Sequence, residues 1–181
     1  MDTVWYFRLF YVPILNFILS MLLFRIINAK GMTGPGPRKP WAVVYFIRLI
    51  VLCVLMWFVS FSIDLAFWIG ISIIVFGQVV FALGYIAMRE HPEQKKAVVD
   101  WGIYGVSRHS HVLAGEITTL GGIVMGWNFN STIYVILWVY FFVDIILTHF
   151  AVLSEEKINI GRFGREYEEY MNNVPRYFMI K

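Results

Sequence analysis

The sequence predicts an all-α polytopic membrane protein: a bundle of five transmembrane helices followed by a C-terminal interfacial amphipathic helix. Of its 181 residues, 59% are hydrophobic and only 15% are charged, whereas a soluble domain is nearer half apolar and a quarter charged. The mean hydropathy is +0.67. Five apolar stretches each approach the roughly 20 residues that a helix needs to cross a bilayer. We therefore expect residues 1–181 to form a single integral membrane domain.

The apolar stretches are separated by clear breaks. The first ends at Arg25 and lacks the small-residue cleavage site of a signal peptide, so we expect a retained helix. Residues 28–40 are rich in Gly and Pro, which break helices, and this linker precedes the second stretch. Only Asp64 separates the second stretch from the third, which predicts an antiparallel hairpin. The expected spans are residues 4–24, 41–63, 65–88, 112–127 and 131–153.

The later spans flank the polar parts of the chain. In every span the apolar residues run continuously rather than in alternation, which predicts helices and not barrel strands. The fourth span is short, and a polar loop, residues 89–111, precedes it. In the tail, residues 154–181, apolar side chains recur every three or four positions up to Pro175. This spacing predicts an amphipathic helix that lies on the membrane interface.

The basic residues predict the orientation. Thirteen of the 15 Lys and Arg residues lie in residues 25–40, in the loop 89–111 or in the tail, and the other two connections carry none. Basic loops stay in the cytoplasm, so we expect a multi-pass protein with its N-terminus outside and its C-terminus cytoplasmic. Anionic headgroups of the bilayer account for the net charge of +3. No nucleic-acid partner is expected.

Ionisable side chains inside or beside the spans are the candidate functional groups. Glu116 and Asp144 lie inside predicted spans, where a charged group is costly and usually faces a partner or a water-filled cavity. Arg108 and His109 border the fourth span, where anchoring to headgroups is the alternative to a functional role. No metal site is expected, because Arg-His-Ser-His offers two imidazoles without further ligands. Cys53 is the single cysteine, so no disulfide forms within the chain.

An ordered set of short motifs runs through the second half, from about Gly77 to Arg176. The set resembles the isoprenylcysteine carboxyl methyltransferase / phospholipid methyltransferase superfamily of integral membrane methyltransferases. That family has an aliphatic pair, Gly-x-Tyr, R-H-P-x-Y, Gly-Glu, a Glu-Glu pair, F-G-x-x-Y-x-x-Y and V-P-R. The corresponding residues are Val98-Val99, Gly102-Ile103-Tyr104, Arg108 to Val112, Gly115-Glu116, Glu155-Glu156, Phe163 to Tyr170 and Val174-Pro175-Arg176.

The resemblance implies S-adenosyl-L-methionine bound in a cytoplasmic pocket under the loop and the tail, and a lipid or lipid-like acceptor that enters from the bilayer. The cofactor would contact Arg89, Val98, Val99, Tyr104, His109, Ser110, His111 and Glu155. The expected catalytic residues are Glu156, Arg108 and Glu116. The residues expected to contact the acceptor are Asp144 and His149.

Two departures from the family pattern bear on the acceptor and the cofactor. Ser110 and Val112 replace a Pro and a Tyr, which loosens the turn after His109 and removes an aromatic wall. Ala151 replaces the Arg that attends the substrate carboxylate in carboxyl methyltransferases. We therefore favour an amine or other headgroup over a prenylcysteine carboxylate. An ammonium acceptor must first lose a proton, for which the candidate bases are Glu116, Glu156 and His149.

Two other functions stay open at this point. An NADPH-dependent membrane reductase of the sterol-reductase type shares a similar R-H-x-x-Y/F-x-G-E stretch. The 2′-phosphate of NADPH would need basic groups such as Arg89, Lys95 and Lys96. The acidic pair Glu155-Glu156 would repel that phosphate. A non-enzymatic membrane scaffold would bind neither cofactor.

Overall fold

Helices are the regular secondary structure of the part of the chain that the structure describes. This computed structural model describes residues 8–27, 39–89, 98–127 and 131–178. Within those ranges there are six α-helices, one 3₁₀ helix and no β-strand, only an isolated bridge between Arg8 and Ser60. The elements are α1 (Tyr11–Ile27), α2 (Lys39–Trp57), α3 (Leu65–Arg89), η2 (Gly102–Gly105), α4 (Ser110–Met125), α5 (Thr132–Phe163) and α6 (Arg165–Asn173).

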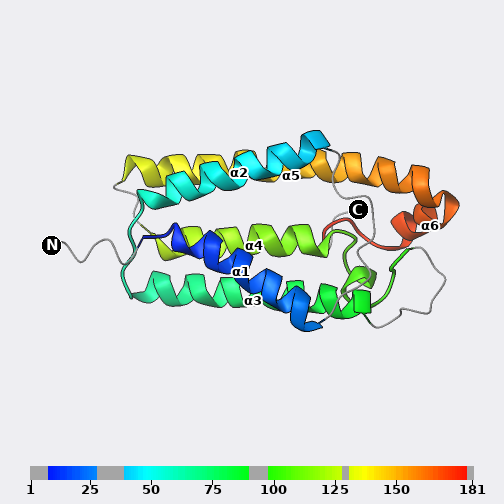
Figure 1. Ribbon diagram of the computed structural model, residues 1–181, viewed down its shortest axis with the longest axis horizontal. Coiled ribbons are helices and arrows are strands. Elements are labelled where there is room, and N and C mark those ends of the chain that lie inside the picture. Colours follow the sequence, from blue (N-terminus) through cyan, green and yellow to red (C-terminus); the bar gives the residue numbers. More distant parts are fainter. Residues whose placement is uncertain (1–7, 28–38, 90–97, 128–130, 179–181) are drawn as a thin grey trace.

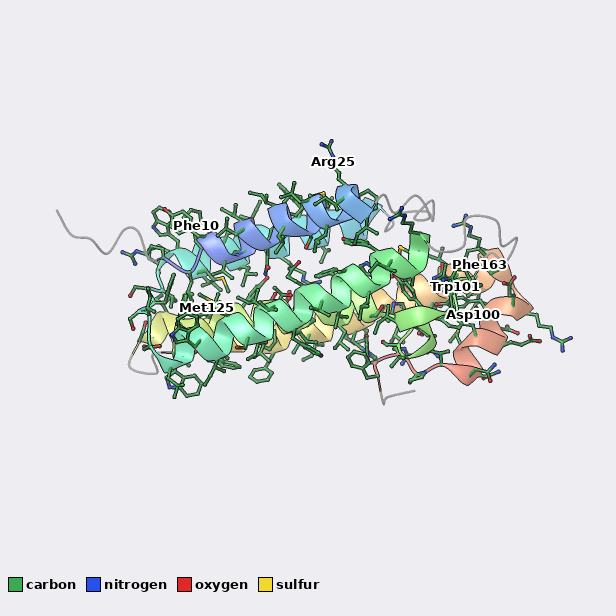
Figure 2. All side chains as sticks on the ribbon, turned by 90° about the horizontal axis from the view of Figure 1, so that it is seen from below. Phe10, Arg25, Asp100, Trp101, Met125 and Phe163 are labelled. Carbon is green, nitrogen blue, oxygen red and sulfur yellow. The ribbon has the colours of Figure 1, made fainter. Side chains whose placement is uncertain are left out.

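Helices α1 to α5 lie along one long axis, and successive helices run in opposite directions (Figure 1). Helix α6 and η2 sit together at one end, which we call the α6 end. Figure 2 shows Asp100, Trp101 and Phe163 near this end and Phe10 and Met125 near the other. The alternation brings the start of α4 and the later part of α5 to the α6 end, so segments distant in sequence meet there.

Two helices, α3 and α5, are long and apolar enough to cross a membrane. Large apolar side chains also point outward from the bundle, among them Phe46, Phe76 and Phe142, each more than half exposed. Soluble monomers rarely expose so much contiguous apolar surface. The predictions of an all-helical chain and of membrane-length helices are confirmed. Five crossings and their orientation stay predictions.

The helix bounds differ from the expected spans at two places. Helix α2 ends at Trp57, so the expectation that the second span continues to residue 63 is wrong. The chain turns out of the helix there, and Val59 accepts a backbone hydrogen bond of 3.0 Å from Leu9. Helix α5 continues past residue 153 to Phe163, because the polar residues that follow favour a helix as much as the apolar ones do. Residues 4–7 of the first expected span lie outside the described residues.

Helices α3 and α4 pack closely through small residues. A Cβ atom added to Gly121 would lie 2.7 Å from the backbone oxygen of Gly70, and one added to Gly70 would lie 2.5 Å from the backbone oxygen of Gly121. Only hydrogen at these positions allows the two backbones to approach so closely. The close packing fixes the start of α4, with His111 beside Gly84, relative to the end of α3.

Helix α6 is held against the protein by its apolar face. Tyr167, Tyr170 and Val174 form a buried cluster with Val98, and the Tyr170 hydroxyl donates a hydrogen bond of 2.8 Å to the backbone oxygen of Tyr104. The sequence predicted that this amphipathic face would lie in the membrane interface. In the structure other parts of the chain cover it, since Val98 and Ile160 supply the apolar surface it needs. Gly164, with a φ of +56°, makes the turn from α5 into α6.

Candidate functional site

A buried ion pair joins the start of α4 to α5 at the α6 end. Arg108 lies two residues before the first residue of α4, and its Nη2 atom lies 2.9 Å from Oε1 of Glu156. The same carboxylate oxygen lies 3.3 Å from Nε2 of His109. Only 2% of the Arg108 side chain and 4% of the Glu156 side chain are exposed. The Arg-His pair and the second residue of the Glu-Glu pair therefore meet, as the resemblance implies.

The tail supplies a second guanidinium to the same carboxylate. Nη2 of Arg176 lies 2.7 Å from Oε2 of Glu156. The backbone pairs as well: Arg108 donates from its amide to the oxygen of Pro175 at 3.0 Å. The Nη1 atom of Arg108 donates to the backbone oxygens of Met171 and Val174, both at 2.6 Å. We call Arg108, His109, Glu156 and Arg176 the corner cluster.

The corner cluster keeps Glu156 ionised. Burial alone would raise the pKa of this carboxyl group, but the hydrogen bonds from His109, Arg176 and Arg108 outweigh it and hold the pKa well below its ordinary value. Two guanidinium groups against one carboxylate leave an excess positive charge. A carboxylate so strongly paired is a weak proton acceptor, so among the three candidate bases Glu156 suits this task least.

Tyr104 and His111 form a second contact next to the corner cluster. The Tyr104 hydroxyl and Nδ1 of His111 lie 2.6 Å apart. Burial raises the pKa of Tyr104 above its ordinary value and lowers the pKa of His111 to about 4. At neutral pH the imidazole is therefore uncharged and the phenol keeps its proton, and the direction of their hydrogen bond follows from which ring nitrogen of His111 is protonated.

A third group lies deeper, where α2, α4 and α5 face one another. Arg48 of α2 donates through Nε to Asp144 of α5 and through Nη2 to the Thr148 hydroxyl at 2.5 Å. The same Nη2 lies 3.5 Å from Oε1 of Glu116 on α4, which also accepts a hydrogen bond of 2.8 Å from Thr148. We call Arg48, Glu116, Asp144 and Thr148 the inner cluster. It brings together two of the predicted residues, Glu116 and Asp144.

A pocket of about 340 Å³ lies against the inner cluster. Its polar lining residues are those of the inner cluster together with Tyr140, His111 and Thr119, and its apolar lining residues include Leu49, Leu52 and Val112. No protein-family model, curated protein or solved structure matches the chain. The geometry and the motifs therefore carry the functional interpretation.

The remaining predicted residues are more scattered. Arg89 is exposed at the end of α3, and Glu155 is exposed on α5 next to the buried Glu156. Val98 packs against the tyrosines of α6, whereas Val99 is half-buried. His149 does not line the pocket; its Nδ1 atom lies 3.3 Å from the hydroxyl of Tyr177. Lys95 and Lys96 lie outside the described residues.

Sequence reasoning missed Arg48 and Arg176 as site residues. Arg48 is a basic residue inside a predicted span, where a partner of opposite charge is required, and Glu116 and Asp144 are the acids within the predicted spans. This pairing rule would have found the inner cluster. Arg176 belongs to the V-P-R motif, which marked the tail without assigning it a partner.

Proposed function

We propose that the chain is an S-adenosyl-L-methionine-dependent integral membrane methyltransferase that acts on a lipid or lipid-like acceptor. One observation carries the proposal. The motif before α4 and the acid pair on α5 are about 48 residues apart in sequence, yet Arg108 and Glu156 form a buried contact. The resemblance assigns both segments to one cofactor site. Five crossings, with the N-terminus outside and the corner cluster at the cytoplasmic face, complete the proposal.

The residues around the corner cluster suit the polar groups of this cofactor. Nε of Arg108 and Nε2 of His111 are buried and have no hydrogen-bond partner among the described residues. Buried polar atoms of this kind are rare without a ligand or water to satisfy them. The excess positive charge of the cluster suits the cofactor's carboxylate, and the exposed Glu155 suits its amino group or ribose hydroxyls. The proposed cofactor contacts are Arg89, Val98, Val99, Tyr104, His109, Ser110, His111 and Glu155.

The cofactor, when bound, supplies an electrophilic methyl group on a sulfonium. The protein would hold the cofactor and the acceptor in line and exclude water from the site. Fixing two reactants in line accounts for roughly 7–11 kcal/mol of a barrier in favourable cases, and exclusion of water strengthens each fixed charge. The corner cluster holds the loop and the tail together over the site. Glu116, with one carboxylate oxygen unpaired among the described residues, is the proposed acceptor of the proton that the substrate must lose.

Binding of two cofactors discriminates this proposal from its rivals. The excess positive charge of the corner cluster would also attract a phosphate, so an NADPH-dependent reductase needs a direct test. Detergent-purified protein is titrated with S-adenosylhomocysteine and with NADPH by calorimetry. Tight binding of S-adenosylhomocysteine supports the methyltransferase, tight binding of NADPH alone refutes it, and binding of neither favours a scaffold.

A pair of exposed carboxylates provides a matched control for this titration. Glu155→Gln changes a proposed cofactor contact, and Glu168→Gln changes an exposed acid on α6 that has no proposed role. Because both side chains are exposed, both variants are expected to fold. We expect Glu155→Gln to weaken S-adenosylhomocysteine binding about 10-fold, the effect of one charge-assisted hydrogen bond, and Glu168→Gln to leave it unchanged.

A further inference from the structure

The charges of the inner cluster do not balance. Arg48 carries one positive charge, whereas Asp144 and Glu116 carry one negative charge each when ionised. Asp144 takes the Nε hydrogen bond of Arg48, while Glu116 lies 3.5 Å from the same guanidinium. The cation is thus used mainly by Asp144, so Glu116, when it is ionised, gives the pocket beside the cluster one net negative charge. His111, which lines the same pocket, is neutral and adds no compensation.

The two oxygens of Glu116 have different surroundings. Oε1 accepts the hydrogen bond from Thr148 and faces Arg48. Oε2 is buried and has no hydrogen-bond partner among the described residues. An ionised oxygen that is neither solvated nor paired is costly in a membrane interior. A ligand that donates a hydrogen bond, and preferably carries positive charge, would remove this cost.

From this geometry we infer that the pocket between α2, α4 and α5 binds the amine headgroup of an amphiphile, with Glu116 as the residue that receives its N–H group. Arg48 is the specificity-determining residue. Its charge is already paired with Asp144, so a carboxylate headgroup would enter a pocket whose other described lining residues include no cation and one further acid, Glu116.

The pocket also fits an apolar chain attached to that headgroup. Leu49 and Leu52 of α2 and Val112 of α4 supply apolar surface to the lining of the same pocket. Leu49 is 38% exposed on the outside of α2, where apolar side chains such as Phe46 and Ile50 project outward. An amine on an alkyl chain can therefore place its headgroup at Glu116 and its chain along α2, whereas a short soluble amine would use only half of the site.

The place of the pocket connects it with the corner cluster. Along α4, Glu116 lies seven residues after His109, or about 10 Å at the rise of a helix. His111 lies between them, lines the pocket and contacts Tyr104. A headgroup at Glu116 is thus near enough to be the methyl acceptor. That role rests on the proposed function; the binding of the amine does not.

Calorimetry in dodecyl maltoside micelles at pH 7.5 tests the inference. The probes are dodecylamine, dodecanoate and butylamine, which separate headgroup charge from chain length. We expect the wild type to bind dodecylamine at least 10-fold more tightly than either other probe. Glu116→Gln should weaken dodecylamine binding about 10-fold, and Glu168→Gln, at an exposed acid on α6 without a proposed role, should leave it unchanged.

A second variant keeps the test decisive if Glu116→Gln unfolds. Leu49→Trp fills the pocket from a partly exposed position without changing charge, and it should abolish dodecylamine binding while the thermal unfolding temperature stays near that of the wild type. Equal binding of dodecylamine and dodecanoate, or no effect of either variant, overturns the inference. If butylamine binds as tightly as dodecylamine, the inference that the ligand carries an apolar chain is wrong.

The same samples are titrated with S-adenosylhomocysteine. Amine binding without S-adenosylhomocysteine binding would leave this pocket assigned and would refute the proposed function. S-adenosylhomocysteine binding without amine selectivity would support the proposed function and would refute the assignment of this pocket to an amine.

Discussion

Replacing Glu156 by Gln removes the one carboxylate that Arg108 and Arg176 share. The Arg108 side chain is 2% exposed and that of Arg176 is 17% exposed, so the two guanidinium groups would face each other with little access to water. Breaking a buried ion pair by neutralising one partner costs about 3–5 kcal/mol. Because Arg176 retains some contact with solvent, we expect a value near the lower limit, about 3 kcal/mol.

The cost should appear as opening of the tail. The corner cluster links the loop before α4 to α5 and to the segment after α6, so its loss weakens the docking of α6 more than the packing of α1 to α5. A change of about 3 kcal/mol raises the open fraction on the order of 100-fold. Native-state trypsin cleavage after Arg165 on α6, followed by mass spectrometry of the released peptide, measures this opening.

The neighbouring acid provides the control. Glu155→Gln makes the same chemical change one residue earlier, at an exposed side chain, and surface changes of this kind alter stability by less than about 0.5 kcal/mol. Its cleavage rate should stay within about two-fold of the wild type. Equal cleavage rates for Glu156→Gln and Glu155→Gln would show that the corner cluster does not hold the tail, and would refute this reasoning.

Three further predictions concern packing, pH and the second contact. Gly121→Ala pushes α3 from α4 and should cost about 1–3 kcal/mol, whereas Gly161→Ala, with open space around it, should not destabilise; thermal unfolding in detergent compares them. The pKa of His111 is lowered to about 4, so the unfolded chain binds a proton more readily. Stability should then fall by about 3 kcal/mol between pH 6.5 and 4, and His111→Asn should lose this part of the pH dependence in pH-scanned unfolding. Tyr104→Phe removes the hydroxyl that contacts His111 and should cost about 1 kcal/mol; an unchanged unfolding temperature would contradict the contact.

The helices were predictable because continuous apolar runs and their breaks are local features. The end of α2 at Trp57 was not predictable, because the residues after it are still mostly apolar. The chain leaves the helix there to pair with Leu9 from a distant segment. The extent of α5 was also missed. Polar residues after 153 end an apolar run but do not end a helix; Gly164 does.

The candidate site was predictable in part. The meeting of Arg108 with Glu156 was expected from the order of motifs, not from any local pattern. The third partner, Arg176, depends on how the chain after α6 turns back, which no periodicity encodes. Arg48 was overlooked although charge pairing within spans identifies it with Glu116 and Asp144 as partners. Intramembrane charge is thus better interpreted by pairing acids with bases than by considering either alone.

The central claim is that this chain transfers a methyl group from a sulfonium donor to an amphiphilic acceptor. Purified protein is incubated with S-adenosylmethionine labelled in its methyl group and with a total lipid extract, and the organic phase is separated by chromatography. We predict a labelled lipid product that requires the protein, and a markedly slower appearance of that product with Glu116→Gln. A protein that binds its acceptor lipids yet leaves all the label in the aqueous phase would contradict the account.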